Sequence, residues 1–311
     1  MEFRILGPLE VVSEGDSVTI RGAKPRALLA LFLVHANRVV ARDRLIDDLW
    51  EGSPPESAVA TLQTYVSQLR SSLGLESLHT RTRGYVLEVE VFELDALRFE
   101  RVLDATPRAR DLAPHSTAAR LAEALSWWRG PALSDFVGAL WADTEAARLE
   151  ELRLDALERW AAARLALGEH AALVPALESL IAEHPLRERL WAHLMLALYR
   201  SDRQADALRA YGRLRQHLVD ELGIEPSTDL AALETAILRH EPEIEWVPER
   251  GRPAVVSPLP SGAVTFLFAD IVGSTRLWEE QPDEMRAAVA DQDQIVRAAV
   301  AAHDGVVVKS T

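Results

Sequence analysis

The long helical stretch between residues 94 and 240 limits the possible folds more than any other part of the chain. It is rich in Ala, Leu, Glu and Arg, and its apolar residues recur at spacings of three and four. That spacing is typical of amphipathic helices, each of which must bury its apolar stripe against a neighbour. The sequence therefore predicts an all-α domain over residues 92–241. The full length of 311 residues is too long for one ordinary core and predicts further domains.

A weak internal repeat of 34 residues lies inside this stretch. Apolar and turn positions between Leu157 and Leu180 recur between Trp191 and Leu214. The period, with Trp and Leu three residues apart and Ala and Tyr four apart, resembles the tetratricopeptide repeat. Helical pairs of that kind stack because no pair can bury its apolar face alone. A plain helical bundle is the alternative, and the match at several positions favours the stacked pairs.

A small sheet and three helices are predicted before the all-α domain. Residues 3–20 alternate between apolar and polar around a turn at 14–16, which predicts an antiparallel sheet. Helices are predicted over residues 24–37, 42–50 and 56–73, and Gly74 is a helix-ending signal. Residues 80–87 predict a hairpin that turns at Gly84. This order is that of a winged helix-turn-helix, so the predicted fold class is mainly α with small β elements.

The helix predicted over residues 56–73 has two chemically different faces. Its apolar face carries Val59, Leu62, Val66, Leu69 and Leu73. The opposite face carries small hydroxyls and amides without a carboxylate, which suits close approach to bases and phosphates in a DNA major groove. An ordinary surface helix is the alternative, but such helices in this chain are rich in Glu and Asp. The composition of the face therefore favours DNA.

The distribution of charge supports the same region. The net charge of −14 argues at first against binding a polyanion. Between residues 57 and 87, however, three arginines and His79 stand against one acid, Glu76. Residues 92–241 instead hold 18 basic and 25 acidic residues, a difference of −7. We therefore expect any nucleic-acid contact within the N-terminal 91 residues.

Residues 1–91 closely resemble the OmpR-type effector domain found at the N-terminus of the Streptomyces antibiotic regulatory protein (SARP) family. The matching stretches are FRILGPLEV (3–11), GAKPRALLALFLVHANRVV (22–40), LIDDLW (45–50), LQTYVSQLRSSLG (62–74) and RTRGYVLEV (81–89). Residues 92–240 resemble that family's bacterial transcriptional activation domain, through LSWWRGPAL (125–133) and the run from 184 to 227. The resemblance implies a sequence-specific transcriptional activator with a recognition helix at 56–73 and a minor-groove wing at 80–85.

The residues expected to contact DNA lie at the start of the first helix, on the recognition helix and on the wing. They are Lys24, Arg26, Thr61, Gln63, Thr64, Ser67, Gln68, Arg70, Arg81, Thr82, Arg83 and Tyr85. The expected partners are double-stranded DNA and RNA polymerase, with two copies of the chain on a direct repeat, because one winged helix contacts few base pairs. No apolar run approaches the ~20 residues that span a bilayer, and no signal peptide is evident, so a cytoplasmic protein is expected.

Five prolines between residues 242 and 262 predict an extended linker, and residues 263–311 predict a partial α/β fragment. The stretch from 268 to 275 is similar to the opening motif of class III nucleotide cyclases. That resemblance assigns a metal to Asp270, phosphate to Gly273, Ser274 and Thr275, and adenine selection to Lys309.

The family's second metal-binding Asp would come just beyond Lys309, and two-metal chemistry needs both carboxylates. The fragment is therefore expected to be inactive, with no cofactor, since Mg²⁺ and ATP would bind only to a complete cyclase domain. Two alternatives stay open: a cyclase whose DNA-binding part couples it to transcription, and a protein-interaction scaffold. The lack of cysteine excludes a thiol nucleophile and a thiolate zinc site.

Overall fold

The structure, a computed structural model, describes residues 1–74, 76–106 and 114–247, together with Met285, Val289, Gln292 and Val296. Two compact units divide the chain, Met1–Trp246 and Val247–Thr311. In the second unit, Met285, Val289, Gln292 and Val296 are helical, within a stretch where apolar spacing between residues 278 and 302 predicts a helix. Most of the predicted linker and the predicted strands of the cyclase-like fragment lie outside the described residues.

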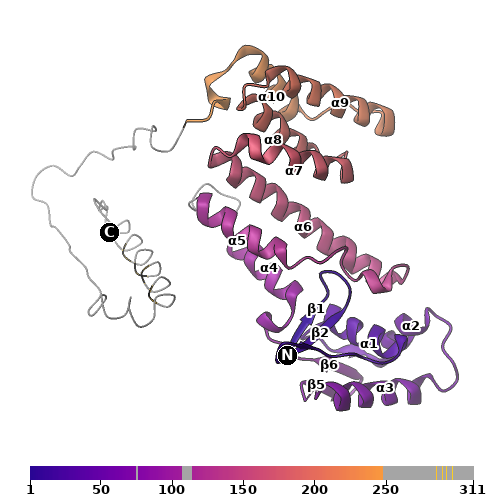
Figure 1. The fold of residues 1–311 in the computed structure, drawn as a ribbon. Helices are drawn as coiled ribbons and strands as arrows, with labels where there is room; N and C mark the ends of the chain where they lie inside the picture. The colour runs from indigo at the N-terminus through magenta and orange to yellow at the C-terminus, as the bar shows by residue number, and fades with distance from the viewer. Residues whose placement is uncertain are drawn as a thin grey trace, which may run out of the picture. The chain divides into compact units, whose positions relative to one another are not determined.

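Two small antiparallel sheets and three helices form the N-terminal domain, which runs from β1 to β6 (Figure 1). The first sheet has the order β1 (Glu2–Arg4), β2 (Glu10–Ser13), β3 (Asp16–Ser17), with Phe3 opposite Val11. The second sheet has the order β4 (Val40–Ala41), β6 (Gly84–Leu87), β5 (Leu78–Arg81). Between them come α1 (Ala23–Val34), α2 (Arg42–Trp50) and α3 (Ala58–Leu73). The predicted order of sheet, three helices and hairpin is confirmed.

The helix α3 differs from its prediction in one detail of its buried stripe. Val59 was expected on the apolar face, but 42% of it is exposed, and Ala58 takes the buried position. Ala58, Leu62 and Val66 succeed one another at four-residue steps, so the stripe begins one residue earlier than predicted. The helix ends at Gly74, whose backbone is left-handed with φ of 59°, as its helix-ending role requires.

The hairpin β5–β6 turns at Thr82 and Arg83, one residue before the predicted turn at Gly84, and β6 needs glycine at its first residue. A side chain at Gly84 would place its Cβ 1.9 Å from the carbonyl oxygen of Val40, because β4 passes directly over this position. Gly84 pairs with Ala41 in the β4–β6 ladder. The absence of a side chain at this residue is therefore what lets the two strands approach.

Seven α-helices make up the described part of the helical domain, which follows the N-terminal domain (Figure 1). They are α4 (Asp95–Ala105), α5 (Pro114–Ser126), α6 (Leu140–Ala166), α7 (His170–Glu183), α8 (Glu188–Tyr199), α9 (Gln204–Leu222) and α10 (Thr228–Arg239). Each helix from α5 to α10 packs against the next one in the sequence. The turns before α7 and α9 each contain a residue of positive φ, Gly168 (82°) and Asp202 (60°), which lie 34 residues apart. The fold class, mainly α with small sheets, agrees with the prediction.

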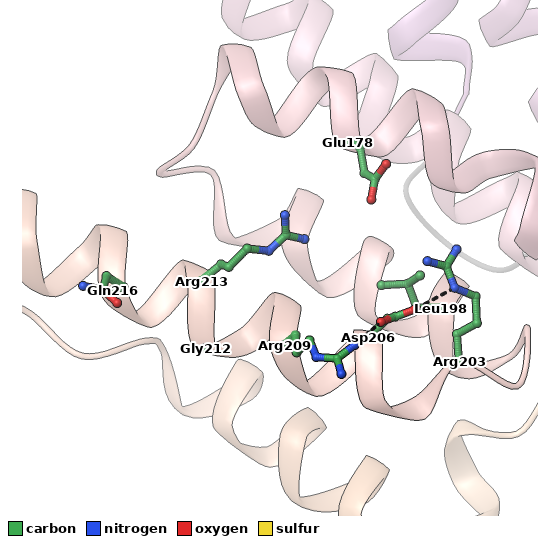
Figure 2. Close-up of a pocket in the computed structure, with 8 residues that line it drawn as sticks. All are labelled: Glu178, Leu198, Arg203, Asp206, Arg209, Gly212, Arg213 and Gln216. Atoms are coloured by element: carbon green, nitrogen blue, oxygen red, sulfur yellow. Dashed lines mark hydrogen bonds and ion pairs between the residues drawn. The ribbon is translucent and has the colours of Figure 1, made fainter.

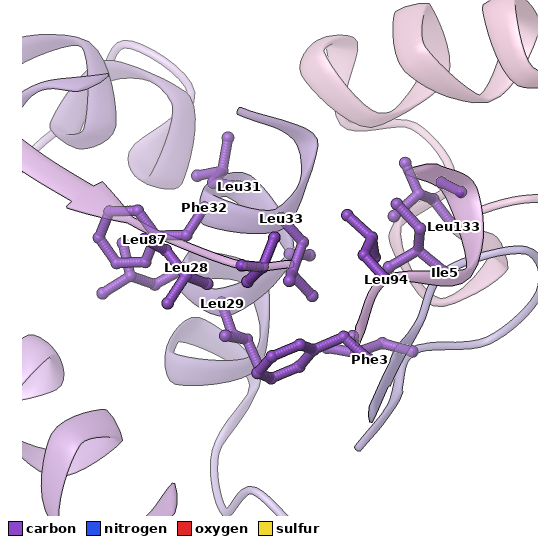
Figure 3. Packing of buried hydrophobic residues seen from close by; sticks show 14 of the residues in the cluster. Phe3, Ile5, Leu28, Leu29, Leu31, Phe32, Leu33, Leu87, Leu94 and Leu133 are labelled. Carbon is purple, nitrogen blue, oxygen red and sulfur yellow. The ribbon is translucent and has the colours of Figure 1, made fainter. Parts of the chain in front are cut away.

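The hydrophobic core does not divide at the predicted domain boundary after residue 91. One cluster of buried side chains includes the N-terminal domain together with α4, α5 and the first part of α6. Figure 3 shows Phe3, Leu29 of α1 and Leu94, which precedes α4, in this cluster. The backbone of Phe3 also forms a parallel bridge with Leu94. The N-terminal domain and the first helices of the helical domain therefore share one core, while the end of α6 and α7–α10 pack around a second cluster of buried side chains.

The compact unit also extends five residues beyond the predicted end of the helical domain at 241. The indole Nε1 of Trp246 donates a 2.9 Å hydrogen bond to the carbonyl of Ala166 at the end of α6. Its ring covers Gly168, where an added Cβ would come within 2.5 Å of the indole. Pro242, the first proline of the predicted linker, therefore belongs to the packed unit.

Candidate nucleic-acid interface

The outward face of α3 is an exposed surface without carboxylates. Gln63, Thr64, Ser67 and Gln68 are all exposed, and Thr61 is half-buried. The Thr64 hydroxyl donates to the carbonyl of Ala60 at 3.0 Å, so it lies flat on the helix. Small side chains on this face let the helix backbone come close to a groove of a nucleic acid.

One residue of this face also links α3 to the rest of the domain. The side-chain Nε2 of Gln68 donates to the carbonyl of Arg21, just before α1, at 3.3 Å. The amide oxygen of Gln68 stays available as an acceptor, so the contact restricts the side chain without using both of its polar atoms.

The β5–β6 hairpin forms the wing beside α3. Thr82 and Arg83 stand exposed at its turn. Within the described residues, the Arg83 side chain has no hydrogen-bond or ion-pair partner, while its carbonyl accepts a 3.0 Å bond from the backbone N–H of Arg42. The backbone of this residue is therefore fixed and its guanidinium is free, which suits a contact with phosphate.

The second wing arginine is already engaged. Arg81 Nη2 lies 3.0 Å from Glu88 Oε1, and His79 Nε2 lies 3.5 Å from the other oxygen of the same carboxylate. All three side chains are substantially exposed, so the pairing is weak and open to competition from a phosphate.

Arg70 connects the recognition helix to the wing. Its Nε donates to the carbonyl of Leu78 at 2.8 Å, and its Nη2 donates to the hydroxyl of Thr80 at 2.9 Å. The groove between α3 and β5 at this point has a volume of about 560 Å³ and is also lined by His79 and Arg81. Arg70 was predicted as a phosphate contact, and the structure instead uses two of its donors to set the distance between helix and wing.

Comparisons with known proteins match both domains. Residues 18–87 match the family described as "Transcriptional regulatory protein, C terminal", and residues 94–238 match "Bacterial transcriptional activator domain". The chain is 42% identical over 257 residues to Regulatory protein DnrI of Streptomyces peucetius. This alignment covers 79% of this chain and 94% of DnrI. The chain belongs to the SARP family. It is a transcriptional regulator with an OmpR-type DNA-binding domain followed by an activator domain.

Two further comparisons concern a mycobacterial SARP-family relative. Transcriptional regulatory protein EmbR of Mycobacterium tuberculosis is 39% identical over 249 residues, covering 78% of this chain and 64% of EmbR. A solved structure, "Mycobacterium tuberculosis EmbR in complex with low affinity phosphopeptide", superposes with a TM-score of 0.72 at 38% identity. The match covers 78% of this chain and 65% of that one, so the winged-helix and helical fold is shared.

Three side chains of this SARP-family chain that were predicted to contact DNA instead make contacts within the protein. Tyr85 is only 7% exposed, and its ring meets Phe32 edge-to-face at 6.3 Å, because β6 faces α1. Arg26 forms an ion pair with Asp135 of the helical domain and donates to the carbonyl of Leu9 at 3.1 Å.

The third is Lys24, whose ammonium donates to the carbonyl of Leu49 near the end of α2. This contact stabilises the C-terminal end of that helix, where unpaired carbonyls attract cations. Lys24, Arg26 and Tyr85 are therefore committed to contacts within the protein.

Sequence reasoning missed the contacts that hold the SARP-family N-terminal domain on its helical domain. Both carboxylate oxygens of Asp95 accept backbone N–H groups, from Ile5 at 2.8 Å and from Leu6 at 3.0 Å. Arg129 Nη2 lies 3.6 Å from the same carboxylate, and burial raises the pKa of Asp95 despite these favourable partners. Residues 5 and 95 are 90 positions apart, so no local pattern could reveal the pair.

The cyclase-like residues Asp270, Gly273, Ser274, Thr275 and Lys309 lie outside the described residues. The family matches end at residue 238, so this resemblance stays a prediction. Among the described residues, no group of three or more His, Asp or Glu side chains is placed to hold a metal ion. No helix in that same part of the chain is long and apolar enough to cross a membrane.

Proposed function

We propose that this regulator reads a specific DNA sequence through the outward face of α3, with the β5–β6 wing on the adjoining backbone. The observation that carries the proposal is the exposed, carboxylate-free face of α3 in a chain whose net charge is −14. Helices that enter the major groove contact base edges with hydroxyl and amide side chains, and their specificity comes from those contacts.

The proposed roles divide by chemistry. Gln63, Thr64, Ser67 and Gln68 are placed to contact base edges or the nearest phosphates, with Thr61 at the rim. Arg81, Thr82 and Arg83 on the wing contact the sugar-phosphate backbone or the minor groove. Arg70 is a positioning residue, because its two hydrogen bonds join α3 to β5 rather than pointing to a ligand.

We further propose that two copies bind a direct repeat and that the helical domain contacts RNA polymerase. The helical domain carries an excess of seven acidic residues, which makes it unsuited to DNA and available for a protein partner. The paired positive-φ turns at Gly168 and Asp202 support a tetratricopeptide-like stacking of α6–α7 on α8–α9. Residues 263–311 have no role in this proposal, and the cyclase alternative has no further support.

The test compares specific and random DNA. Genome-wide selection of bound fragments with the full chain gives the preferred site. Thr64→Ala and Gln68→Ala should then weaken binding to that site more than to random DNA, by roughly 1–3 kcal/mol for a good bidentate contact and less for a lone hydroxyl. Equal losses on both DNAs would contradict a role in base recognition.

A matched control is available on α6. The hydroxyl of Thr144 donates to the carbonyl of Leu140 at 2.7 Å, in the same arrangement as Thr64 on Ala60. Thr144→Ala should leave both affinities unchanged, because this threonine lies on the helical domain. For the direct repeat, inserting half a helical turn between half-sites should abolish cooperative binding, while a full turn should largely preserve it.

A further inference from the structure

A groove lies between α7 and α9 of the helical domain, away from the proposed DNA interface (Figure 2). Its volume is about 710 Å³. Arg203, Arg209 and Arg213 line the side formed by α9 and the residue before it, and Glu178 on α7 lies opposite. Three guanidiniums in one groove stand out in a domain whose net charge is −7.

One carboxylate orients two of these guanidiniums. Arg203 Nε lies 2.9 Å from Asp206 Oδ2, and Arg209 Nη1 lies 2.6 Å from Asp206 Oδ1. Hydrogen bonds from Arg203 and then from Arg209 hold the pKa of Asp206 below its usual range, so this side chain is ionised at neutral pH. The cluster therefore keeps one positive charge in excess, and the outer donors of both arginines remain available.

The third guanidinium is held by an aromatic ring instead. The Cζ of Arg213 lies 5.4 Å from the centroid of the Trp191 ring, which is almost fully buried. A cation over an indole face is stabilised without using its N–H donors. In the described part of the chain, no carboxylate or carbonyl accepts a bond from Arg213, whereas most arginines of this domain are ion-paired.

Gly212 leaves the floor of the groove open. It lies inside α9, where glycine is less favourable than alanine. A Cβ at this position would meet no atom of the described residues within 4 Å, so nothing in that part of the chain requires glycine. A bare helix backbone on the floor of a groove allows a ligand to approach closely.

We propose that this groove binds an extended acidic peptide segment of a partner protein. Carboxylates of the peptide would pair with Arg213 and with the free donors of Arg203 and Arg209, while its main chain passes Gly212. Glu178 and Asp206 favour a peptide over a nucleic acid. Their carboxylates would repel a continuous phosphate backbone, whereas they can accept hydrogen bonds from the backbone amides of a peptide.

The test uses fluorescence anisotropy on the full chain. The ligand is a fluorescein-labelled peptide, Gly-Ser-Glu-Glu-Glu-Glu-Ser-Gly, compared with its counterpart in which lysine replaces glutamate. The acidic peptide should bind and the basic one should not. Arg213→Glu should raise the Kd at least tenfold, and Arg239→Glu, the same change on an exposed arginine of α10 outside the groove, should leave it within twofold.

A variant that leaves the net charge unchanged distinguishes binding in the groove from non-specific attraction of the peptide to positive charge. Gly212→Leu should also raise the Kd at least tenfold, because the side chain fills the floor, while the melting temperature stays equal or rises. Arg83→Glu on the wing should leave peptide binding unchanged, which keeps this test independent of DNA binding. The proposal would be overturned by absent binding at millimolar peptide or by wild-type affinity in both groove variants. Loss of peptide binding in Arg83→Glu alone, or an Arg213-dependent affinity for a labelled oligothymidylate above that for the peptide, would also overturn it.

Discussion

Asp95, the first residue of α4, accepts a 2.8 Å hydrogen bond from the backbone N–H of Ile5 in the N-terminal domain. The second oxygen of the same carboxylate accepts from Leu6, so one side chain satisfies two consecutive backbone donors. Only 6% of Asp95 is exposed, and buried donors of this kind are costly to leave unpaired. The orientation of the DNA-binding domain on the helical domain therefore depends strongly on one buried carboxylate.

Asp95→Ala should destabilise the protein by about 3–5 kcal/mol, because two buried donors and the Arg129 guanidinium lose their partner. Chemical denaturation at pH 7 measures the change. Asp95→Asn keeps one acceptor oxygen and no buried charge, so it should cost less.

The two variants should also differ in pH dependence. The folded-state pKa of Asp95 is raised by burial, so the folded state holds its proton more tightly than the unfolded state. The stability of the wild type relative to Asp95→Asn should therefore improve as the pH falls toward 3.8. A constant difference would contradict the raised pKa.

Arg83→Ala should weaken binding to every DNA sequence and reduce the slope of log affinity against log salt by about one unit, because its free guanidinium neutralises one phosphate. Affinities measured at several salt concentrations give the slope. Arg239→Ala is the control, and an unchanged slope for Arg83→Ala would exclude this side chain from the interface.

Glu88→Gln should strengthen DNA binding and make its salt dependence steeper. The carboxylate of Glu88 pairs with Arg81 at 3.0 Å and lies near His79, so its removal frees the wing arginine and removes a negative charge that faces the phosphates. Glu90→Gln, two residues later and also exposed, controls for the change in net charge. Weaker binding by Glu88→Gln would show that the carboxylate is needed to hold Arg81 in position.

The stability of the protein should fall as the pH drops below about 6.5, and His170 should contribute to this fall. Burial, together with the nearby Arg200, lowers the pKa of His170, so its folded-state stabilisation is present above 6.5 and is lost as the pH falls through the lowered value. Neither ring nitrogen has a hydrogen-bond partner among the described residues, and the ring packs on Trp246 at 5.3 Å.

His170→Phe tests this prediction. The variant keeps the ring contact and should reduce the pH dependence of unfolding between pH 7 and 5. His35 and His193, whose pKa values are also lowered by burial, should account for the remainder. An unaltered pH profile in His170→Phe would assign the whole effect to those two residues.

Gly84→Ala should disrupt the wing. The new Cβ would overlap the carbonyl of Val40, and flexible side chains cannot absorb a clash with backbone. A loss of about 1–3 kcal/mol is expected from overpacking of this size, with weakened DNA binding. Gly212→Ala controls for the loss of a glycine without a clash, because a Cβ there would meet nothing within 4 Å in the described residues and its φ, like that of Gly84, is not positive. Equal stability of Gly84→Ala and wild type would contradict the close approach of β4 and β6.

The order of elements was predictable from the sequence, because periodic apolar residues and the glycine that ends α3 are local signals. The partners that polar side chains choose could not be predicted from the sequence. Arg26 and Arg70 both lie where arginines could reach DNA, but the partners that hold them are a carboxylate 109 residues away and a strand that returns beside the helix. The predicted burial of Val59 was wrong for a smaller reason, because Ala58 takes the buried position one residue earlier.

The core shared by β1, α1 and α4 has a consequence for engineering this regulator. A chimaera joined after residue 91 would cut through the packing of Phe3 with Leu94 and would separate Asp95 from its two donors. New operator specificity is better grafted by exchanging the exposed side chains of α3 and the wing turn, while Gln68 keeps its hydrogen bond to the carbonyl of Arg21. In this protein the replaceable module is a set of side chains, because the DNA-binding domain cannot be cut away from the first helices of the helical domain without opening their shared core.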